Sequence, residues 1–303
     1  MTTTAPTDAD EERFIVVIGD ALIDEIHLSD ATTEFVGGAA LNVAVGLATL
    51  GVRAKLIAMI GDDADGATIR GFLSEHGVDL IATVGRHGSS RGISDRVDGE
   101  PRYAFNSAAR ARRIEFGPLE RDAIASAALV VVSCFPFDDT SQSADLVDAI
   151  ADPKNRLIID PNPRRGMLAS PEAFRENFDR IAGHSLLVKV GDDDSALLYG
   201  STLDELESHL LAVGCHAILG TAGKDGAEIV TSNGMGSHEP IATLPGPIID
   251  TMGAGDAVLA SVTESIFADG LPKDEWTWHR VIERAMRVAA ATCRHEGARL
   301  RLP

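Results

Sequence analysis

A turn of small residues near the C-terminal end of the chain carries a carboxylate, Asp256, at the start of an apolar helical run. The turn reads Asp-Thr-Met-Gly-Ala-Gly-Asp over residues 250–256. Small residues let the backbone approach a ligand, and the free N–H groups of a first helical turn attract anions. The turn is suited to hold a phosphoryl group while Asp256 accepts a proton from a hydroxyl. The alternative is that Asp256 only caps the helix.

This turn differs from two common glycine-rich loops that bind phosphates. It lacks the Gly-Lys-Ser/Thr ending of a Walker A loop. It also lacks the Gly-x-Gly-x-x-Gly spacing, between a strand and a helix, of a dinucleotide-binding unit. A nicotinamide-dependent dehydrogenase is therefore poorly supported.

The elements that must position this turn follow an alternating pattern. Short apolar runs rich in β-branched residues suit strands buried on both faces of a parallel sheet. These runs cover residues 14–18, 55–60, 129–132, 157–159, 186–190 and 217–219. Helical stretches cover residues 39–50, 64–76, 119–127, 141–151, 203–213, 255–268 and 279–295. Strands that alternate with helices predict an α/β layered fold.

Two segments, at about residues 22–35 and 85–113, interrupt this alternation. Both contain loosely alternating stretches that are typical of exposed strands. They are predicted to pair into a small β-sheet that covers a site, and the alternative is two surface loops. The exposed strand edges of such a sheet favour a homodimer through it.

Composition restricts the class of protein. The 303 residues carry a net charge of −19, which disfavours nucleic acid and anionic membranes as partners. The three cysteines show no metal or redox spacing, so a reducing cytoplasm is expected. Residues 1–12 are polar and acidic and lack the pattern of a signal peptide. We predict a disordered tail over 1–12 and one domain over 13–303.

Several motifs, in one order along the chain, resemble those of the ribokinase/PfkB carbohydrate kinases. The turn at 250–256 resembles the main family signature, and Gly-Gly-Ala-Ala-Leu-Asn at 37–42 resembles the first one. Ile-Gly-Asp-Asp at 60–63, Gly-Val-Asp at 77–79 and Thr-Ala-Gly-Lys-Asp-Gly-Ala at 221–227 complete the set. The resemblance implies a three-layer fold, with a central mostly parallel sheet flanked by helices and a small β-sheet lid. It also implies ATP and Mg²⁺ as cofactors, and leaves a requirement for K⁺ open.

The resemblance also implies roles for individual residues. Asp256 would be the base, and the backbone of Gly253, Ala254 and Gly255 would stabilise charge on the phosphoryl group. The sugar would be bound by Asp24, Gly37, Gly38, Asn42, Arg102, Asn106, Arg164 and Asp256. The nucleotide would be bound by Lys189, Thr221, Gly223, Gly226, Thr251, Gly253 and Gly255. Each position has a structural alternative: Asp24 caps a turn, the glycines permit a close approach, and Arg164 with its neighbour Asn162 forms a strand-end turn.

One segment departs from the family pattern. The family often carries an Asn-x-x-Glu motif that organises Mg²⁺ through water, and here Gly191 and Asp194 stand in its place. Asp194 keeps the acid group with a shorter reach, and Asp192 or Asp193 are the alternatives for this role. The stretch is also compatible with an acidic helix start, which the helix dipole favours.

The acceptor is expected to be a small sugar. Only 5% of the residues are aromatic, which suits a polar sugar better than a stacked purine. The lid segment supplies Arg102, Tyr103, Phe105 and Asn106 as selecting residues. The motifs look most like those of fructokinases and 2-keto-3-deoxygluconate kinases, so the primary hydroxyl of a fructose, 2-keto-3-deoxygluconate or ribose type of sugar is predicted. The alternatives are a nucleoside kinase of this family and a catalytically silent sugar-binding regulator.

Overall fold

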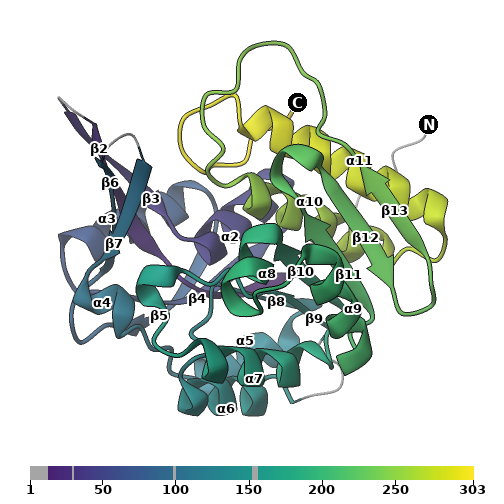
Figure 1. Ribbon diagram of the computed structural model, residues 1–303. Helices are drawn as coiled ribbons and strands as arrows, with labels where there is room; N and C mark the ends of the chain where they lie inside the picture. Colours follow the sequence, from purple (N-terminus) through teal and green to yellow (C-terminus); the bar gives the residue numbers. More distant parts are fainter. Residues whose placement is uncertain (1–12, 29–30, 98–99, 152–155) are drawn as a thin grey trace.

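The larger of two sheets runs through the middle of the molecule (Figure 1). A computed structural model describes residues 13–28, 31–97, 100–151 and 156–303, so the predicted tail over 1–12 lies outside the described residues. Within the described residues this sheet has nine strands, in the order β13-β12-β11-β10-β9-β8-β1-β4-β5. Its strands are β1 (Ile15–Gly19), β4 (Ala54–Ile60), β5 (Asp79–Val84), β8 (Leu129–Ser133), β9 (Leu157–Asp160), β10 (Leu187–Gly191), β11 (Ala217–Thr221), β12 (Ala227–Thr231) and β13 (Gly236–Glu239).

The strands from β11 to β5 are parallel, and β12 and β13 extend the sheet in antiparallel pairings. Parallel strands place their carboxyl ends at one edge of the sheet. The residues that follow β1, β8, β9, β10 and β11 therefore meet along that edge. This edge is where most of the predicted site residues lie.

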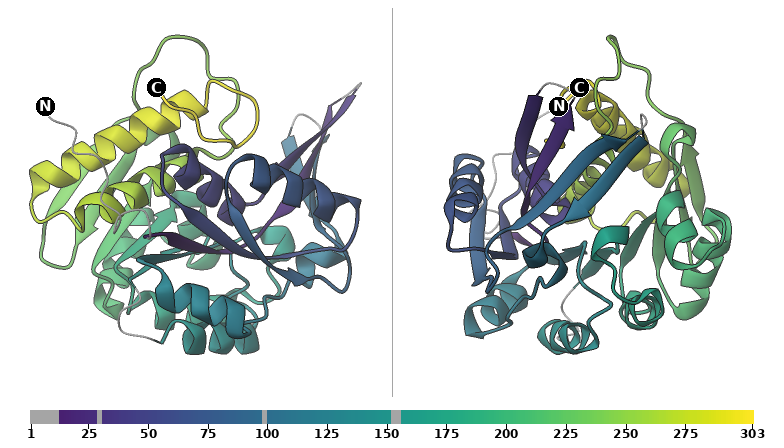
Figure 2. Two further views of the ribbon diagram at one scale, coloured as in Figure 1. Left: turned by 180° about the vertical axis from the view of Figure 1, so that it is seen from behind. Right: turned by 60° about the vertical axis from the view of Figure 1, so that its left-hand side comes forward.

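Helices cover both faces of the large sheet, as Figures 1 and 2 show. One face is covered by α2 (Ala39–Thr49), α3 (Ala64–Glu75), α10 (Ala254–Asp269) and α11 (Glu275–Thr292). The other is covered by α5 (Pro118–Ser126), α6 (Thr140–Ala149), α7 (Pro171–Ala182) and α9 (Leu203–Val213), with α8 (Asp192–Leu198) after β10. Alternate residues of β1 point to opposite faces, so Ile15 and Val17 join the first core cluster while Val16 and Ile18 join the second.

The two predicted inserts pair into a second sheet, which has four strands in the described part of the chain. It consists of β2 (Leu22–Leu28), β3 (Ala31–Gly37), β6 (Ser90–Val97) and β7 (Glu100–Phe105), in the order β3-β2-β6-β7. The sheet projects from the side of the molecule that carries α2 and α3 (Figures 1 and 2). The second insert also contains a short helix, α4 (Ser107–Arg110), which its polar composition did not predict.

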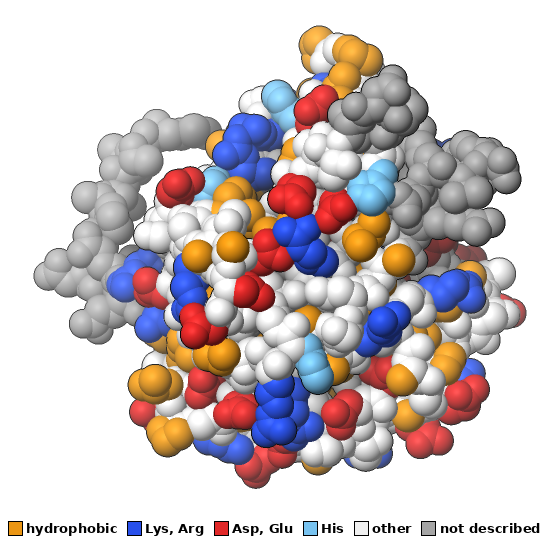
Figure 3. Space-filling view, turned by 90° about the vertical axis from the view of Figure 1, so that its left-hand side faces the viewer, with side chains coloured by type: hydrophobic (Ala, Val, Ile, Leu, Met, Phe, Trp, Pro, Cys, Tyr) orange, Lys and Arg blue, Asp and Glu red, His pale blue; other side chains and the backbone are white. Residues whose placement is uncertain are grey.

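Arg91, at the start of β6, joins the small sheet to the body. Its guanidinium donates to both carboxylate oxygens of Asp65 on α3, at 2.5 and 2.7 Å. It also donates to Glu25 of β2 and Glu34 of β3, at 2.7 Å each. A guanidinium that binds a carboxylate through two parallel hydrogen bonds fixes geometry as well as charge. Figure 3 shows acidic and basic side chains intermingled on this face of the molecule.

Candidate active site

Asp256 lies in the first turn of α10, with only 7% of its surface exposed. The side-chain amide of Asn42, on α2, donates a hydrogen bond of 2.8 Å to Oδ2 of Asp256. Burial raises the pKa of Asp256, while the Asn42 hydrogen bond and the charges of Lys189 and Arg164 oppose that rise. Asp256 is therefore a buried carboxylate that a neutral amide donor orients and that two cations stabilise.

The turn before α10 requires its glycine. Gly253 has a φ of 74°, in the left-handed region, and a Cβ there would lie 2.4 Å from the carbonyl oxygen of Ala298. The carboxylate of Asp250 accepts from the N–H of Met252 at 2.9 Å and from the N–H of Gly297 at 3.0 Å. These bonds hold the turn against the C-terminal segment, so the first N–H groups of α10 have a fixed direction. Thr251 lies in the same turn and is exposed.

Asp24, on β2, lies against two glycines. A Cβ at Gly37 would lie 2.2 Å from Oδ2 of Asp24, and a Cβ at Gly92 would lie 3.1 Å from Oδ1. Burial, with added repulsion from Asp20 and Asp256, raises the pKa of Asp24 to about 7. The carboxylate of Asp24 thus occupies space that only glycine leaves free, within electrostatic reach of Asp256.

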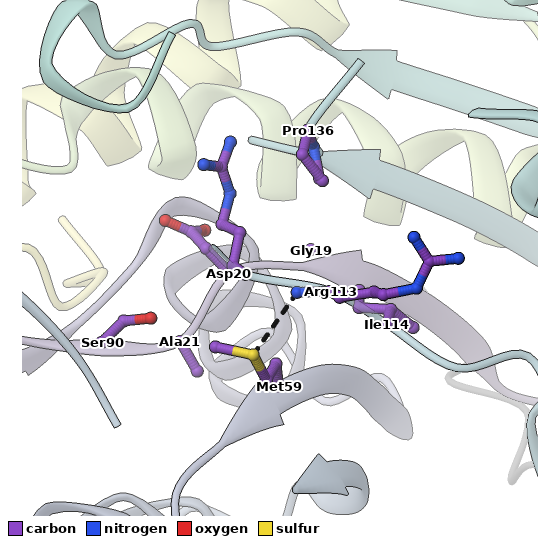
Figure 4. A pocket seen from close by; sticks show the side chains of 9 residues that line it. Gly19, Asp20, Ala21, Met59, Ser90, Arg113, Ile114 and Pro136 are labelled. Carbon is purple, nitrogen blue, oxygen red and sulfur yellow. Dashed lines mark hydrogen bonds between the residues drawn. The ribbon is translucent and has the colours of Figure 1, made fainter. Parts of the chain in front are cut away.

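Asp20, which is not among the site residues predicted from the sequence, belongs to the same acidic group. It follows β1 directly, is 7% exposed, and accepts a 3.0 Å hydrogen bond from the N–H of Ala40 at the start of α2. Gly38 has a φ of 111°, and a Cβ there would lie 2.8 Å from the carbonyl oxygen of Asp20. Asp20 also lines a small pocket with Ser90 and Pro136, from which the guanidinium of Arg113 points away (Figure 4).

Lys189 and Asp160 form a buried ion pair, with 3.3 Å between Nζ and the carboxylate. Lys189 ends close to the helix start, because a Cβ at Gly255 would lie 3.2 Å from its Nζ. The ammonium of Lys189 counteracts the rise that burial imposes on the pKa of Asp160. The structure therefore supplies a positive charge beside the first turn of α10. Asp160 is the last residue of β9. No local sequence pattern indicates that it pairs with Lys189 on the neighbouring strand.

Asp194 is buried, whereas Asp192 and Asp193 are exposed. Oδ2 of Asp194 accepts a 2.7 Å hydrogen bond from the N–H of Gly191. Burial raises the pKa of Asp194 to about 6, and the charge of Lys189 opposes that rise. Of the three acids in this segment, Asp194 is the one whose carboxylate faces the buried cation.

The segment after β9 contributes a second cation. Arg164 has an exposed side chain, and its positive charge lowers the pKa values of Asp20, Asp24 and Asp256 relative to burial alone. Asn162 precedes it with a φ of 38°, which is uncommon for a residue with a side chain. The chain thus turns sharply after β9 and brings the charge of Arg164 to the acidic group.

Four of the predicted nucleotide-binding residues, Lys189, Thr221, Gly223 and Gly226, lie in or just after β10 and β11, and the other three lie in the turn at the start of α10. Thr221 donates from Oγ1 to the carbonyl oxygen of Val190 at 3.3 Å. Gly226 has a φ of 99°, and a Cβ there would lie 2.1 Å from the carbonyl oxygen of Glu239. Gly223 has a φ of 50°, and nothing lies within 4 Å of its Cβ position, so a ligand has room beside it.

Two predicted sugar-binding residues belong to the small sheet and its exit. The side chain of Arg102 lies outside the described residues. Asn106 caps α4: its Oδ1 accepts from the N–H groups of Ala109 and Arg91, and its Nδ2 donates to the carbonyl oxygen of Ser89. The side chain of Asn106 therefore holds the exit of the small sheet in place. The helix cap spacing from Asn106 to Ala109 is a sequence signal for this role.

In this arrangement a buried acid, Asp256, lies at the amino end of a helix near the ammonium of Lys189. A second acid, Asp24 on a strand of the small sheet, lies within electrostatic reach of Asp256. A large, mostly parallel sheet with helices on both faces and a second, small sheet define a ribokinase-like α/β architecture. The chain belongs to the pfkB family of carbohydrate kinases, whose model matches residues 12–303. The fold class and the family expected from the motifs are thereby confirmed.

Relatives and solved structures agree with this assignment. A fructokinase of Klebsiella pneumoniae is 27% identical over 301 residues, which covers 95% of this chain and 96% of the relative. A probable fructokinase-4 of Arabidopsis thaliana is 27% identical over 316 residues and covers 97% and 94% of the two chains. The structure of a Vibrio cholerae fructokinase with fructose, ADP and calcium superposes with a TM-score of 0.76 at 23% identity, covering 95% of each chain. Aminoimidazole riboside kinase from Salmonella enterica, with aminoimidazole riboside and an ATP analog, gives a TM-score of 0.75 at 22% identity, covering 94% and 95%.

Among the helices of the described ranges, none is long and apolar enough to cross a membrane.

Proposed function

We propose that this protein transfers the terminal phosphoryl group of ATP to the primary hydroxyl of a small sugar, with fructose as the first candidate. The observation that carries the proposal is the placement of Asp256: a buried carboxylate at the amino end of α10, oriented by Asn42. A base at this position lies next to the helix N–H groups, which attract a phosphoryl group. Fructose is favoured because relatives in bacteria and plants are fructokinases.

Asp256 serves as the base in this proposal. It accepts the proton of the sugar hydroxyl while the N–H groups of Gly253, Ala254 and Gly255 stabilise the charge on the transferring group. Burial raises the pKa of Asp256, which makes it a better proton acceptor than an exposed aspartate. The proton moves from the hydroxyl oxygen to the carboxylate as the new oxygen–phosphorus bond forms.

Asp24, Gly37, Gly38 and Asn42 bind the sugar in this proposal. The ionised carboxylate of Asp24 accepts hydrogen bonds from sugar hydroxyls, and Oδ1 of Asn42 accepts another. Arg164 contributes a donor at the same site. Arg102 is included among the sugar-binding residues because of the family resemblance. Asn106 acts by holding the strand exit, because its amide is fully engaged with the backbone.

The nucleotide binds along the ends of β10 and β11 in this proposal. Lys189 provides a positive charge for the phosphates, Thr221, Gly223 and Gly226 line the base and ribose side, and Thr251 lies at the turn. Asp194 fits a role in holding Mg²⁺ through water, because one of its oxygens is fixed by Gly191 and the residue is buried. Mg²⁺ supplies charge neutralisation on the phosphates when it is bound with ATP.

The small sheet acts as a lid over the sugar in this proposal. Phe35 of β3 contacts the C-terminal segment, since a Cβ at Gly297 would lie 3.2 Å from its ring. A closed lid excludes water, which otherwise competes with the sugar as acceptor. The edge strands β3 and β7 also offer a surface for pairing with a second copy of the chain. Catalysis in the cytoplasm completes the proposal, because ATP is available there.

A panel of acceptors with coupled ADP detection tests this function. The assay contains Mg²⁺ and compares K⁺ with Na⁺ for fructose, 2-keto-3-deoxygluconate, ribose, a nucleoside and no acceptor. We expect ADP release that depends on a sugar, with the highest kcat/KM for fructose. Sugar binding without ADP release would instead identify a regulator, and the highest activity with the nucleoside would identify a nucleoside kinase.

A further inference from the structure

A second group of acidic side chains lies away from the candidate active site, where α9 packs against β11 and β12. It consists of Asp204 and Glu207 on α9 and Glu228 on β12. One carboxylate oxygen of each residue lies within 4.8 Å of those of the other two. The three residues differ in exposure: Glu207 is buried, Glu228 is half-buried and Asp204 is exposed. The group therefore opens to solvent on one side only.

Glu207 is the unusual member of this group. Only 4% of its surface is exposed, and its Oε1 is buried without a hydrogen-bond partner among the described residues. A buried polar atom without a partner is unfavourable by about 1–3 kcal/mol, and more when it is charged. Such an atom is rare in folded proteins, and an unseen ion is one of its ordinary explanations.

The backbone makes room for this carboxyl group. Gly220 on β11 pairs directly with Glu228 on β12. A Cβ at Gly220 would lie 2.0 Å from Oε1 of Glu207. The missing side chain at position 220 therefore admits the Glu207 carboxyl to the sheet surface beside Glu228, so the unpartnered group is directed into the acidic group.

Burial, with repulsion from Glu228 and Asp204, raises the pKa of Glu207 to about 8. Two states relieve this repulsion. In one, Glu207 is protonated and neutral. In the other, a cation binds between the three carboxylates. The solvent-facing position of Asp204 gives a cation an entry path and leaves room for water ligands.

We propose that Asp204, Glu207 and Glu228 bind one hard divalent cation, with Ca²⁺ as the favoured ion. Oxygen donors alone suit Ca²⁺ and Mg²⁺ rather than zinc or copper. Ca²⁺ bonds of about 2.3–2.6 Å span widely spaced carboxylates, whereas Mg²⁺ requires about 2.0–2.1 Å in a strict octahedron. Water completes the coordination on the exposed side.

A cation at this site would tie α9 to the hairpin of β11 and β12. That hairpin carries the turn with Thr221, Gly223 and Gly226 between its strands. The site would therefore stabilise the turn that the proposed function assigns to the nucleotide. The cation site itself does not depend on that function, since its residues belong to no predicted substrate site.

The experiment uses the full-length, nucleotide-free protein after treatment with a chelator. Ca²⁺ is titrated by calorimetry, and Tm is measured with and without excess Ca²⁺. We expect the wild type to bind one equivalent with a Tm rise of about 2 °C or more. Glu207→Gln should lose the binding. Without Ca²⁺ at neutral pH it should show a higher Tm than the wild type, because folding of the wild type must either protonate Glu207 or bury its charge, and glutamine requires neither.

Three further variants make the test specific. Asp204→Asn changes an exposed ligand, is expected to fold normally, and should weaken Ca²⁺ binding at least about tenfold. Glu75→Gln, an exposed acid on α3, should behave like the wild type. Asp194→Asn should keep the Ca²⁺-dependent rise in Tm, which separates this site from the proposed Mg²⁺ position. Absence of saturable Ca²⁺ binding by the wild type, or full binding by Glu207→Gln and Asp204→Asn, would overturn the proposal and identify Glu207 as a buried neutral acid.

Discussion

Asn42 on α2 and Asp256 on α10 are joined by a 2.8 Å hydrogen bond across 214 residues of sequence. The bond connects the first glycine-rich motif to the last one. It forms because α2 and α10 pack side by side on one face of the large sheet, with Ala40, Val43, Ala257 and Val258 in a single core cluster. Packing of these helices therefore sets the orientation of the carboxylate.

Removing this bond should shift the pH dependence of turnover. The Asn42 hydrogen bond lowers the pKa of Asp256 against the effect of burial, so Asn42→Leu should raise that pKa further. We expect kcat of the variant to fall at lower pH and to recover as the pH rises, so that its pH profile is displaced to higher pH. The kcat–pH profiles of both proteins measure this shift. A uniform loss at every pH would assign Asn42 to substrate binding alone.

Sugar affinity should depend on pH through Asp24. Its pKa is raised to about 7, and the ionised form accepts hydrogen bonds from hydroxyls, so KM for the sugar should fall by about tenfold between pH 6 and pH 8. Asp24→Asn should flatten this dependence, with KM for ATP as the internal control. A dependence unchanged in Asp24→Asn would exclude Asp24 as its source.

The Asp24 carboxyl group should also make the folding stability of the protein depend on pH. A carboxyl group whose folded pKa exceeds its unfolded value contributes stability below the unfolded pKa, and this contribution is lost as the pH rises through about 7. Asp24→Asn should therefore raise Tm at pH 8 and leave it nearly unchanged at pH 4.

Gly253 should tolerate no side chain. Its positive φ alone makes alanine unfavourable by about 1–2 kcal/mol, and the Cβ would also clash with the backbone of Ala298. Gly253→Ala should lower the free energy of unfolding by more than the matched variant Gly234→Ala, whose φ of 83° is similar and whose Cβ position is open. Denaturant titration measures both, and equal losses would show that the turn relaxes without strain. Only Gly253→Ala should also reduce kcat.

Variants of the ion pair between Lys189 and Asp160 distinguish a structural role of Lys189 from a role in binding phosphates. Lys189→Met leaves a buried carboxylate unpaired, which should be unfavourable by about 3–5 kcal/mol. Lys189→Met with Asp160→Asn removes both charges and should recover most of the free energy of unfolding. If Lys189 binds phosphates, KM for ATP stays high in the double variant. If the double variant recovers both the free energy of unfolding and the wild-type KM for ATP, the only role of Lys189 is to pair with Asp160.

Local sequence predicted the alternation of strands and helices because most strands of the large sheet are buried on both faces and read as apolar runs. It missed β5, an edge strand with largely half-buried residues, and the antiparallel strands β12 and β13. It also missed α7, and it gave the start of α8 only as an alternative, because the sequences of these helices contain many polar residues. In these elements, tertiary packing and sheet pairing determine the structure more than apolar periodicity does.

Local sequence supplied candidate site residues where the chemistry depends on short spacing, as in the turn from Asp250 to Asp256. Asp20 could not be distinguished from Asp24 by sequence, because both acids lie within a few residues of the end of β1. The pairings of Asp160 with Lys189 and of Asn42 with Asp256 arise from helix packing and strand register. Residues far apart in sequence meet only when helix packing and strand register are fixed, so no local sequence pattern reveals these pairings.

The role of Asp256 as the base is tested most directly by Asp256→Asn. Asparagine preserves the size of the side chain and cannot accept the proton, so ADP formation with the preferred sugar should fall at least about 10²-fold. Calorimetry should show sugar binding close to that of the wild type, which separates loss of chemistry from loss of the site. An unchanged rate of ADP formation in Asp256→Asn would contradict the account.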